Sequence, residues 1–121
     1  MASSVDDTDW ERIVLLYDIL VRLAPSSVVS LNRAVAVSMA SGPAAGLAEV
    51  DALADDPLLA ASHLLPSVRG ELLRRLGRND EARAELELAR QRCTSEQERT
   101  VLDRKLEDLA QLLGRPGSPA G

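Results

Sequence analysis

Very few residues in this sequence carry the side chains that most often catalyse reactions or bind metal ions. His63 is the only histidine and Cys93 the only cysteine, and they stand far apart, without the close spacing of a zinc motif. No histidine lies near Cys93 in sequence to activate its thiol as a nucleophile. Asp55 and Asp56 have no base or metal motif beside them, which is typical of a loop and a helix end. We therefore expect structural roles for these four residues, no metal or cofactor, and a protein that is not an enzyme.

The composition limits both the architecture and the partners. The chain has 121 residues, of which 45% are hydrophobic and only 2% aromatic, enough for one compact domain with an aliphatic core. The net charge of -5 argues against nucleic acid as a direct partner, because duplex binding needs clustered lysine and arginine. The net negative charge lies in the first half of the chain, where nine acidic residues stand against three arginines. This acidic surface either serves solubility or attracts a basic partner.

The cysteine count and the distribution of apolar residues predict where the protein resides. One cysteine cannot form an internal disulfide. The first residues lack the basic segment and the apolar run of a secretory signal, and no stretch is long and apolar enough for a membrane-spanning helix. We expect a soluble, cytoplasmic protein that does not bind membranes.

Apolar periodicity predicts six helices and no strands, which is an all-α fold. The helices are expected over residues 9–24, 28–40, 43–53, 63–76, 80–92 and 96–113. The side chains expected to cap their N-termini are Thr8 with Glu11, Ser26 or Ser27, Ser62, Asn79, and Ser95 with Glu98. The helical domain would then cover residues 9–113, after a flexible or artificial start over 1–8 and before a disordered tail over 114–121.

Small residues in the second half of the chain indicate how the helices pack. Gly70, Gly77, Ala82, Leu86 and Ala89 have the spacing at which two antiparallel helices touch and turn. This stretch resembles one tetratricopeptide (TPR) repeat, a family in which helix pairs of roughly 34 residues stack into an α-α superhelix. A less regular unit precedes it, with Ala34, Gly42 and Gly46 in the corresponding places.

Counted with this repeat, the first helix is the second helix of a unit whose first helix is absent. Its apolar arc extends well past the stripe that neighbouring helices would cover, through Leu15, Leu16, Ile19 and Leu23. An apolar surface of that kind normally packs against something. Either its neighbours enclose this helix, or further polypeptide or a second copy of the chain covers it.

Four segments go beyond a generic repeat, at residues 9–20, 31–37, 42–47 and 63–77. Together they resemble the C-terminal TPR-like extension of one group of bacterial extracytoplasmic-function RNA polymerase sigma factors, and Leu-Asn-Arg-Ala-Val-Ala-Val at 31–37 is the most specific part. The resemblance implies a non-catalytic domain that modulates transcription initiation through contacts with the sigma regions or RNA polymerase. The sigma regions that bind polymerase and promoter DNA are absent from this chain.

Two other functions remain open from the sequence. A stand-alone adaptor would bind a peptide in the groove that the first helices of the repeats line. The candidate groove residues are Asn32, Arg33, Ser38, Ser67, Glu71 and Arg74. Asn32 and Arg33 either hold a peptide backbone and carboxylate or make hydrogen bonds between helices. Alternatively, the first helix pairs with its counterpart in a homodimer.

Overall fold

The computed structural model describes residues 8–113, and the N-terminal segment before Thr8 and the tail expected over 114–121 lie outside this range. The described chain is all-α, as predicted: it forms six α-helices and one short 3-10 helix, with no strand among these residues. The elements are α1 (Trp10–Leu23), α2 (Ser27–Ser41), α3 (Pro43–Asp51), η2 (Pro57–Leu59), α4 (Leu64–Arg75), α5 (Asn79–Arg92) and α6 (Glu96–Leu113).

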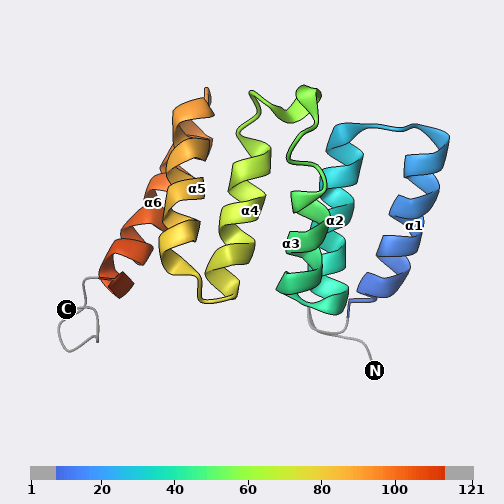
Figure 1. Cartoon of the computed structure of the whole chain (residues 1–121), viewed down its shortest axis with the longest axis horizontal. Coiled ribbons are helices and arrows are strands. Elements are labelled where there is room, and N and C mark those ends of the chain that lie inside the picture. The colour runs from blue at the N-terminus through green and yellow to red at the C-terminus, as the bar shows by residue number, and fades with distance from the viewer. Residues whose placement is uncertain (1–7, 114–121) are drawn as a thin grey trace.

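The six helices stand side by side in chain order and run alternately up and down (Figure 1). Each helix packs against the next along the chain, and α2 also contacts α4. In consequence α1 and α6 form the two ends of the row. Between Thr8 and Leu113, none of the helices combines the length and the apolar character needed to cross a membrane.

Close helix contacts occur where the sequence places its small residues. A Cβ atom added to Gly70 of α4 would lie 2.8 Å from Cγ of Leu86 on α5. One added to Gly46 of α3 would overlap the Cβ of Ser38 on α2. The predicted touching points of these helix pairs are therefore confirmed, whereas the superhelical geometry of a TPR stack stays a prediction.

The core runs along the middle of the row. Leu73, Leu86 and Leu109 are fully enclosed, on α4, α5 and α6. Ala82, Leu86 and Ala89, the predicted core stripe of α5, are all fully buried. The helix α1 contributes no fully buried side chain, so the core is built by the segments that follow it.

Two of the predicted helix caps are wrong. The helix α1 is capped by Asp9, whose Oδ1 accepts from the Arg12 N–H at 3.1 Å, rather than by Thr8. A carboxylate at this position also interacts favourably with the positive end of the helix, which favours aspartate over the threonine before it. The helix α5 starts with Asn79 already inside it and has no side-chain cap, and the preceding Arg78 pairs with Glu81 instead.

The other predicted helix starts and ends agree more closely with the structure. The hydroxyl of Ser26 caps α2 and accepts from the Val29 N–H at 3.5 Å. The hydroxyl of Ser62 accepts from the Leu64 N–H at 3.0 Å, but α4 starts one residue later than predicted, and its N-cap residue is His63, without a side-chain hydrogen bond. Gly77 adopts a φ of 79°, the left-handed conformation that ends α4 and that glycine adopts without strain. The helix α3 ends at Asp51, two residues earlier than expected, and turns follow it.

Candidate interaction surfaces

The outer face of α1 carries more exposed large hydrophobic side chains than any other helix of the described chain. Its large side chains are between 51% exposed (Ile19) and 78% exposed (Leu23), with Leu15 and Leu16 in between. Leu20, which the periodicity places on the inner side, is 45% exposed and adds to this face. Among residues 8–113 no neighbour encloses the helix, so the α1 outer face, defined as these five residues, is uncovered by the described part of the chain.

An arginine ties α1 to the rest of the row. The Nε of Arg33 on α2 lies 2.6 Å from Oδ1 of Asp18 on α1, and its Nη1 lies 2.5 Å from Oε1 of Glu49 on α3. The hydrogen bond with Asp18 raises the pKa of Arg33, although partial desolvation opposes it. Arg33 was a candidate for the groove, but the structure places it between three helices, where it holds their orientation.

Arg69 makes the same kind of bridge one unit further along the chain. Its Nε lies 2.8 Å from Oδ1 of Asp51 on α3, and its Nη1 lies 3.4 Å from Oε2 of Glu85 on α5. Arg69 follows Arg33, and Glu85 follows Glu49, at the offset that separates Gly46 from Ala82. The arginine and the glutamate of these bridges therefore recur with the same period as the small residues, whereas Asp18 and Asp51 are 33 residues apart.

A groove lies between α2, α4 and α6, and it includes a cavity of about 230 Å³. Ser38, Ser67 and Glu71, three of the candidate groove residues, line this cavity together with Arg75 and Lys105. Its remaining lining residues are apolar: Val35, Val68 and Leu72. The groove is thus an apolar hollow with two basic side chains and one acidic side chain around it.

The charges at the groove centre on Glu71. Its carboxylate accepts from Nη2 of Arg74 at 2.5 Å and lies 3.4 Å from Nζ of Lys105 and 3.5 Å from Nε of Arg75. Desolvation raises the pKa of Glu71, but the hydrogen bond from Arg74 and the charge of Lys105 outweigh it and lower the pKa below its ordinary value. The acid therefore stays ionised and links α4 to α6.

The other groove candidates have different surroundings. Ser38 donates its hydroxyl to the carbonyl of Val35 at 2.6 Å and is 4% exposed, so its hydrogen bond stays within α2. Asn32 is exposed on α2 but does not line the cavity. Arg74 likewise lies outside the lining and holds Glu71. The sequence analysis did not identify Arg75, although this residue stands one helical turn after Glu71 on the same face. It also did not identify Lys105, because the helix of this residue was not expected to line the groove.

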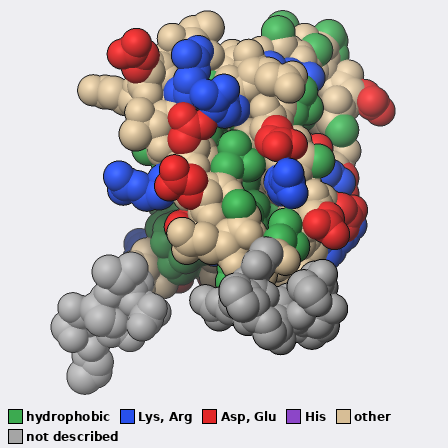
Figure 2. Space-filling view, turned by 90° about the vertical axis from the view of Figure 1, so that its left-hand side faces the viewer, with side chains coloured by type: hydrophobic (Ala, Val, Ile, Leu, Met, Phe, Trp, Pro, Cys, Tyr) green, Lys and Arg blue, Asp and Glu red, His purple; other side chains and the backbone are tan. Residues whose placement is uncertain are grey.

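The opposite end of the row differs in character from α1. Figure 2 shows the end formed by α5 and α6, where acidic and basic side chains alternate around apolar atoms. Arg90 of α5 is paired there with Asp103 of α6, and Arg83 lies 3.7 Å from Glu87. This end is therefore a mixed charged surface, and the chain is asymmetric between its two ends.

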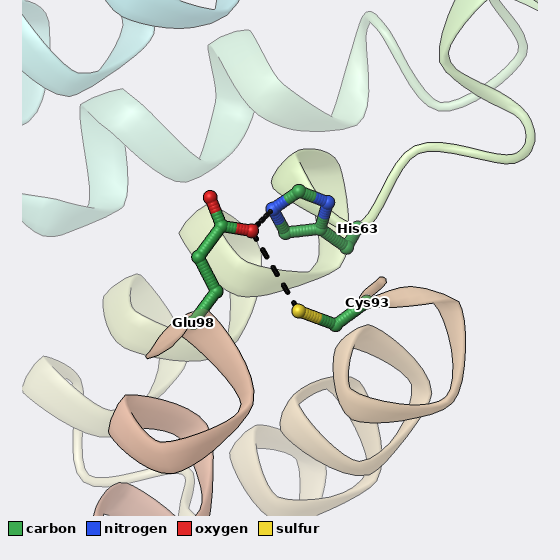
Figure 3. A group of neighbouring side chains, drawn as sticks. All are labelled: His63, Cys93 and Glu98. Carbon is green, nitrogen blue, oxygen red and sulfur yellow. Dashed lines mark hydrogen bonds and ion pairs between the residues drawn. The ribbon is translucent and has the colours of Figure 1, made fainter. Parts of the chain in front are cut away.

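Three chemistry-bearing side chains that are separated in sequence meet at one corner of the fold. His63 precedes α4, Cys93 follows α5, and Glu98 lies in the first turn of α6 (Figure 3). Nε2 of His63 lies 2.5 Å from Oε2 of Glu98, and Sγ of Cys93 lies 3.6 Å from the same oxygen. Sequence spacing gave no sign of this cluster, because it assigned Glu98 to a capping box and treated His63 and Cys93 as isolated.

The capping box predicted at the start of α6 forms only in part. Ser95 does accept from the Glu98 N–H, at 3.4 Å. The Glu98 carboxylate reaches across to His63 instead of back to its own helix start. The Glu98 side chain thus forms an ion pair outside its own helix instead of the hydrogen bond that would complete the capping box.

The chain is similar to a protein found among curated sequences. The chain is 44% identical over 109 residues to an uncharacterized protein of Rhizobium meliloti (strain 1021), a match that covers 90% of this chain and 25% of that protein. The chain thus spans about a quarter of the length of the curated relative it matches. No family model and no solved structure matches the chain.

Proposed function

We propose that this chain is a non-catalytic protein-interaction domain of an extracytoplasmic-function sigma factor, and that it modulates transcription initiation by contacting the sigma regions or RNA polymerase. The Leu-Asn-Arg-Ala-Val-Ala-Val segment at residues 31–37 and the segment at 63–77 support the sigma-factor assignment. The matched relative is much longer than the shared part, which leaves room in that protein for further regions.

The observation that carries the proposal is the exposed α1 outer face. Leu15, Leu16, Ile19 and Leu23 are all more than half exposed, on a helix with few polar positions. Complete burial of a large aliphatic side chain is worth about 1.5–3 kcal/mol, so covering four that are already partly buried contributes several kcal/mol. That energy is enough to hold a neighbouring region of a longer polypeptide against α1.

The electrostatics fit a protein partner better than DNA. The chain carries a net charge of -5, and the promoter would be recognised by sigma regions outside it. The domain would then act on DNA binding only through its contacts with those regions or with polymerase.

The direct test uses the full-length factor. Deleting residues 9–113 and measuring transcription from the factor's promoter should change the output, and unchanged output would refute the proposal. A sharper test replaces Leu16 and Ile19 of the α1 outer face by glutamate and measures binding of the sigma regions. Arg22→Glu is the matched control, because it is an exposed α1 residue whose replacement changes the net charge by the same amount.

A second candidate is an adaptor that binds a peptide, and the groove of about 230 Å³ favours it. Arg75 and Lys105 would face an acidic group of the peptide across the apolar floor. The basic positions of the carboxylate clamp found in chaperone adaptors fall near Leu64 and Val68, so a C-terminal carboxylate is not the expected ligand. A pull-down that recovers an unrelated peptide, but neither sigma regions nor polymerase, would favour the adaptor.

A homodimer through α1 is the third candidate, because two copies of the α1 outer face would cover each other. Sedimentation of the wild-type chain and of the Leu16→Glu, Ile19→Glu variant distinguishes it from the other two. A dimer that dissociates in the variant supports self-association, since two buried carboxylates destabilise such an interface strongly. A monomer in both cases leaves the α1 outer face for a different partner.

A further inference from the structure

The corner where α4 begins, α5 ends and α6 begins brings together an imidazole, a thiol and a carboxylate (Figure 3). One ligand atom from each of His63, Cys93 and Glu98 lies within 4.8 Å of the other two. The carboxylate oxygen of Glu98 lies between the other two groups, at 2.5 Å from the imidazole nitrogen and 3.6 Å from the sulfur.

This order of contacts does not suit a nucleophilic cysteine. In a cysteine–histidine–acid triad the imidazole lies between the thiol and the acid, because it must take the proton of the thiol. Here the acid lies between the thiol and the imidazole. The cluster therefore lacks the hydrogen bond between nucleophile and base on which such chemistry depends.

We propose that His63, Cys93 and Glu98 form a binding site for a zinc ion, with a water molecule in the fourth position. Imidazole nitrogen, thiolate sulfur and carboxylate oxygen are the ligand atoms that zinc takes from proteins, usually four in a tetrahedron. Calcium and magnesium prefer oxygen ligands alone, so the sulfur and nitrogen select against them. The thiolate and the carboxylate together balance the charge of the dication.

One of the three separations between ligand atoms already has the value that zinc requires. With bond lengths of about 2.0–2.3 Å, two ligand atoms of a tetrahedral site lie about 3.5 Å apart. The separation of 3.6 Å between the Cys93 sulfur and the Glu98 oxygen already has this value. The His63 nitrogen and the Glu98 oxygen must separate by about 1 Å. Glu98 allows this by rotation, because half of its side chain is exposed.

The thiol is held in place while the other two ligands face solvent. Cys93 is 3% exposed, its N–H donates to the carbonyl of Arg90 at 3.3 Å, and its carbonyl accepts from the guanidinium of Arg99 at 3.0 Å. His63 and Glu98 are partly exposed, which gives an ion a path from water. On binding, the thiol proton is released to solvent and the sulfur turns from its hydrogen bond with the carbonyl of Ser95 to the metal. Nε2 of His63 gives up the hydrogen that it shares with Glu98, so the imidazole binds as the neutral tautomer with its proton on Nδ1.

Cobalt, a spectroscopic substitute for zinc, tests the site in the untagged 121-residue chain. Titration with Co²⁺ should produce a thiolate-to-cobalt charge-transfer band that saturates at one ion per chain and disappears when Zn²⁺ is added. The band reports on this site alone, because Cys93 is the only cysteine. Zn²⁺ at a hundredfold excess over its Kd should raise the Tm by about 10 °C. Absence of a thiolate band would overturn the proposal.

Substitutions separate a metal site from an ordinary ion pair. His63→Ala, Cys93→Ser and Glu98→Gln should each weaken Zn²⁺ binding by about 100-fold or more, beyond the roughly 10- to 100-fold typical of residues that only support a ligand. Glu96→Gln, an exposed neighbour in the first turn of α6, is the control and should bind as wild type.

Because Cys93 is buried, its variant alone is a poor test, and the Glu98→Gln variant decides the matter. Its side chain is half exposed, so it should keep the helical circular dichroism spectrum while losing the metal. Wild-type Zn²⁺ affinity in Glu98→Gln would contradict the proposal. The result is independent of transcription assays, so the zinc site and the sigma-factor assignment can fail separately.

Discussion

The glycines at the helix contacts allow a quantitative prediction about packing. Replacing glycine by alanine inside an exposed helix stabilises it by about 1 kcal/mol. At Gly46 the added methyl group would overlap the Cβ of Ser38, which is 4% exposed and cannot move without its backbone. Overpacking of this kind costs about 1–3 kcal/mol, and more where a helix must shift. We therefore expect Gly46→Ala to lower the free energy of unfolding by about 2 kcal/mol.

Gly70→Ala should be milder. Its methyl group would lie 2.8 Å from Cγ and 2.9 Å from Cδ2 of Leu86, and this side chain can rotate although it is fully buried. We expect a loss of about 1 kcal/mol, which corresponds to a fall in Tm of about 4 °C for a domain of this size, against about 8 °C for Gly46→Ala.

Urea unfolding followed by circular dichroism measures both variants. The combination of Gly46→Ala with Ser38→Gly is the control, because it removes the nearest of the atoms that the new methyl group would meet. The two substitutions should show a favourable coupling of about 0.5–3 kcal/mol. If Gly46→Ala stabilises the chain, as it would in an open helix, the reasoning about close contact between α2 and α3 is refuted.

Exposed and charged side chains lead to three further expectations. Leu16→Glu with Ile19→Glu should lower the free energy of unfolding by less than about 1 kcal/mol, because both lie on the surface, and a larger loss in urea would contradict their exposure. Arg33→Ala breaks two ion pairs between helices and should cost about 1 kcal/mol. A loss that persists undiminished in high salt would count against an electrostatic cause. The lowered pKa of Glu71 stabilises the fold above the ordinary glutamate range, and this contribution is lost as the pH falls below that range and through the lowered pKa. Glu71→Gln should therefore flatten the acid limb of a plot of Tm against pH, and an unchanged acid limb would be inconsistent with the network.

Much of the fold was predictable because its signals are local. Proline and glycine break the chain at Pro25, Gly42 and Gly77, and apolar periodicity marks the helices between them. The cap at Asn79 was predicted wrongly because α5 already includes that residue and starts without a side-chain cap. The cap at Thr8 was predicted wrongly because the adjacent Asp9 is also chemically suited to that position. The choice between such side chains depends on the exact backbone geometry and on competing charges, which a pattern of residue types does not contain.

The residues of the candidate surfaces were likewise predictable only where their contacts lie within one helix. Ser67 and Glu71 were predictable as neighbours because a helix places residues four apart on one face. Lys105 and the cluster of His63, Cys93 and Glu98 were not, because their contacts join helices that lie apart in sequence. Glu98 in particular had a sufficient local explanation as a capping residue, which hid its second possible role.

We expect α1 to open first among the six described helices, because it contributes least to the core. It lies at one end of the row and contributes no fully buried side chain, so its detachment leaves the core of the later helices intact. Its amide hydrogens should then exchange with solvent through local unfolding, at rates well above those of α4 and α5. A partner that covers the α1 outer face would slow exchange in that helix alone. Amide protection at α1 is therefore a measure of how often this surface is occupied.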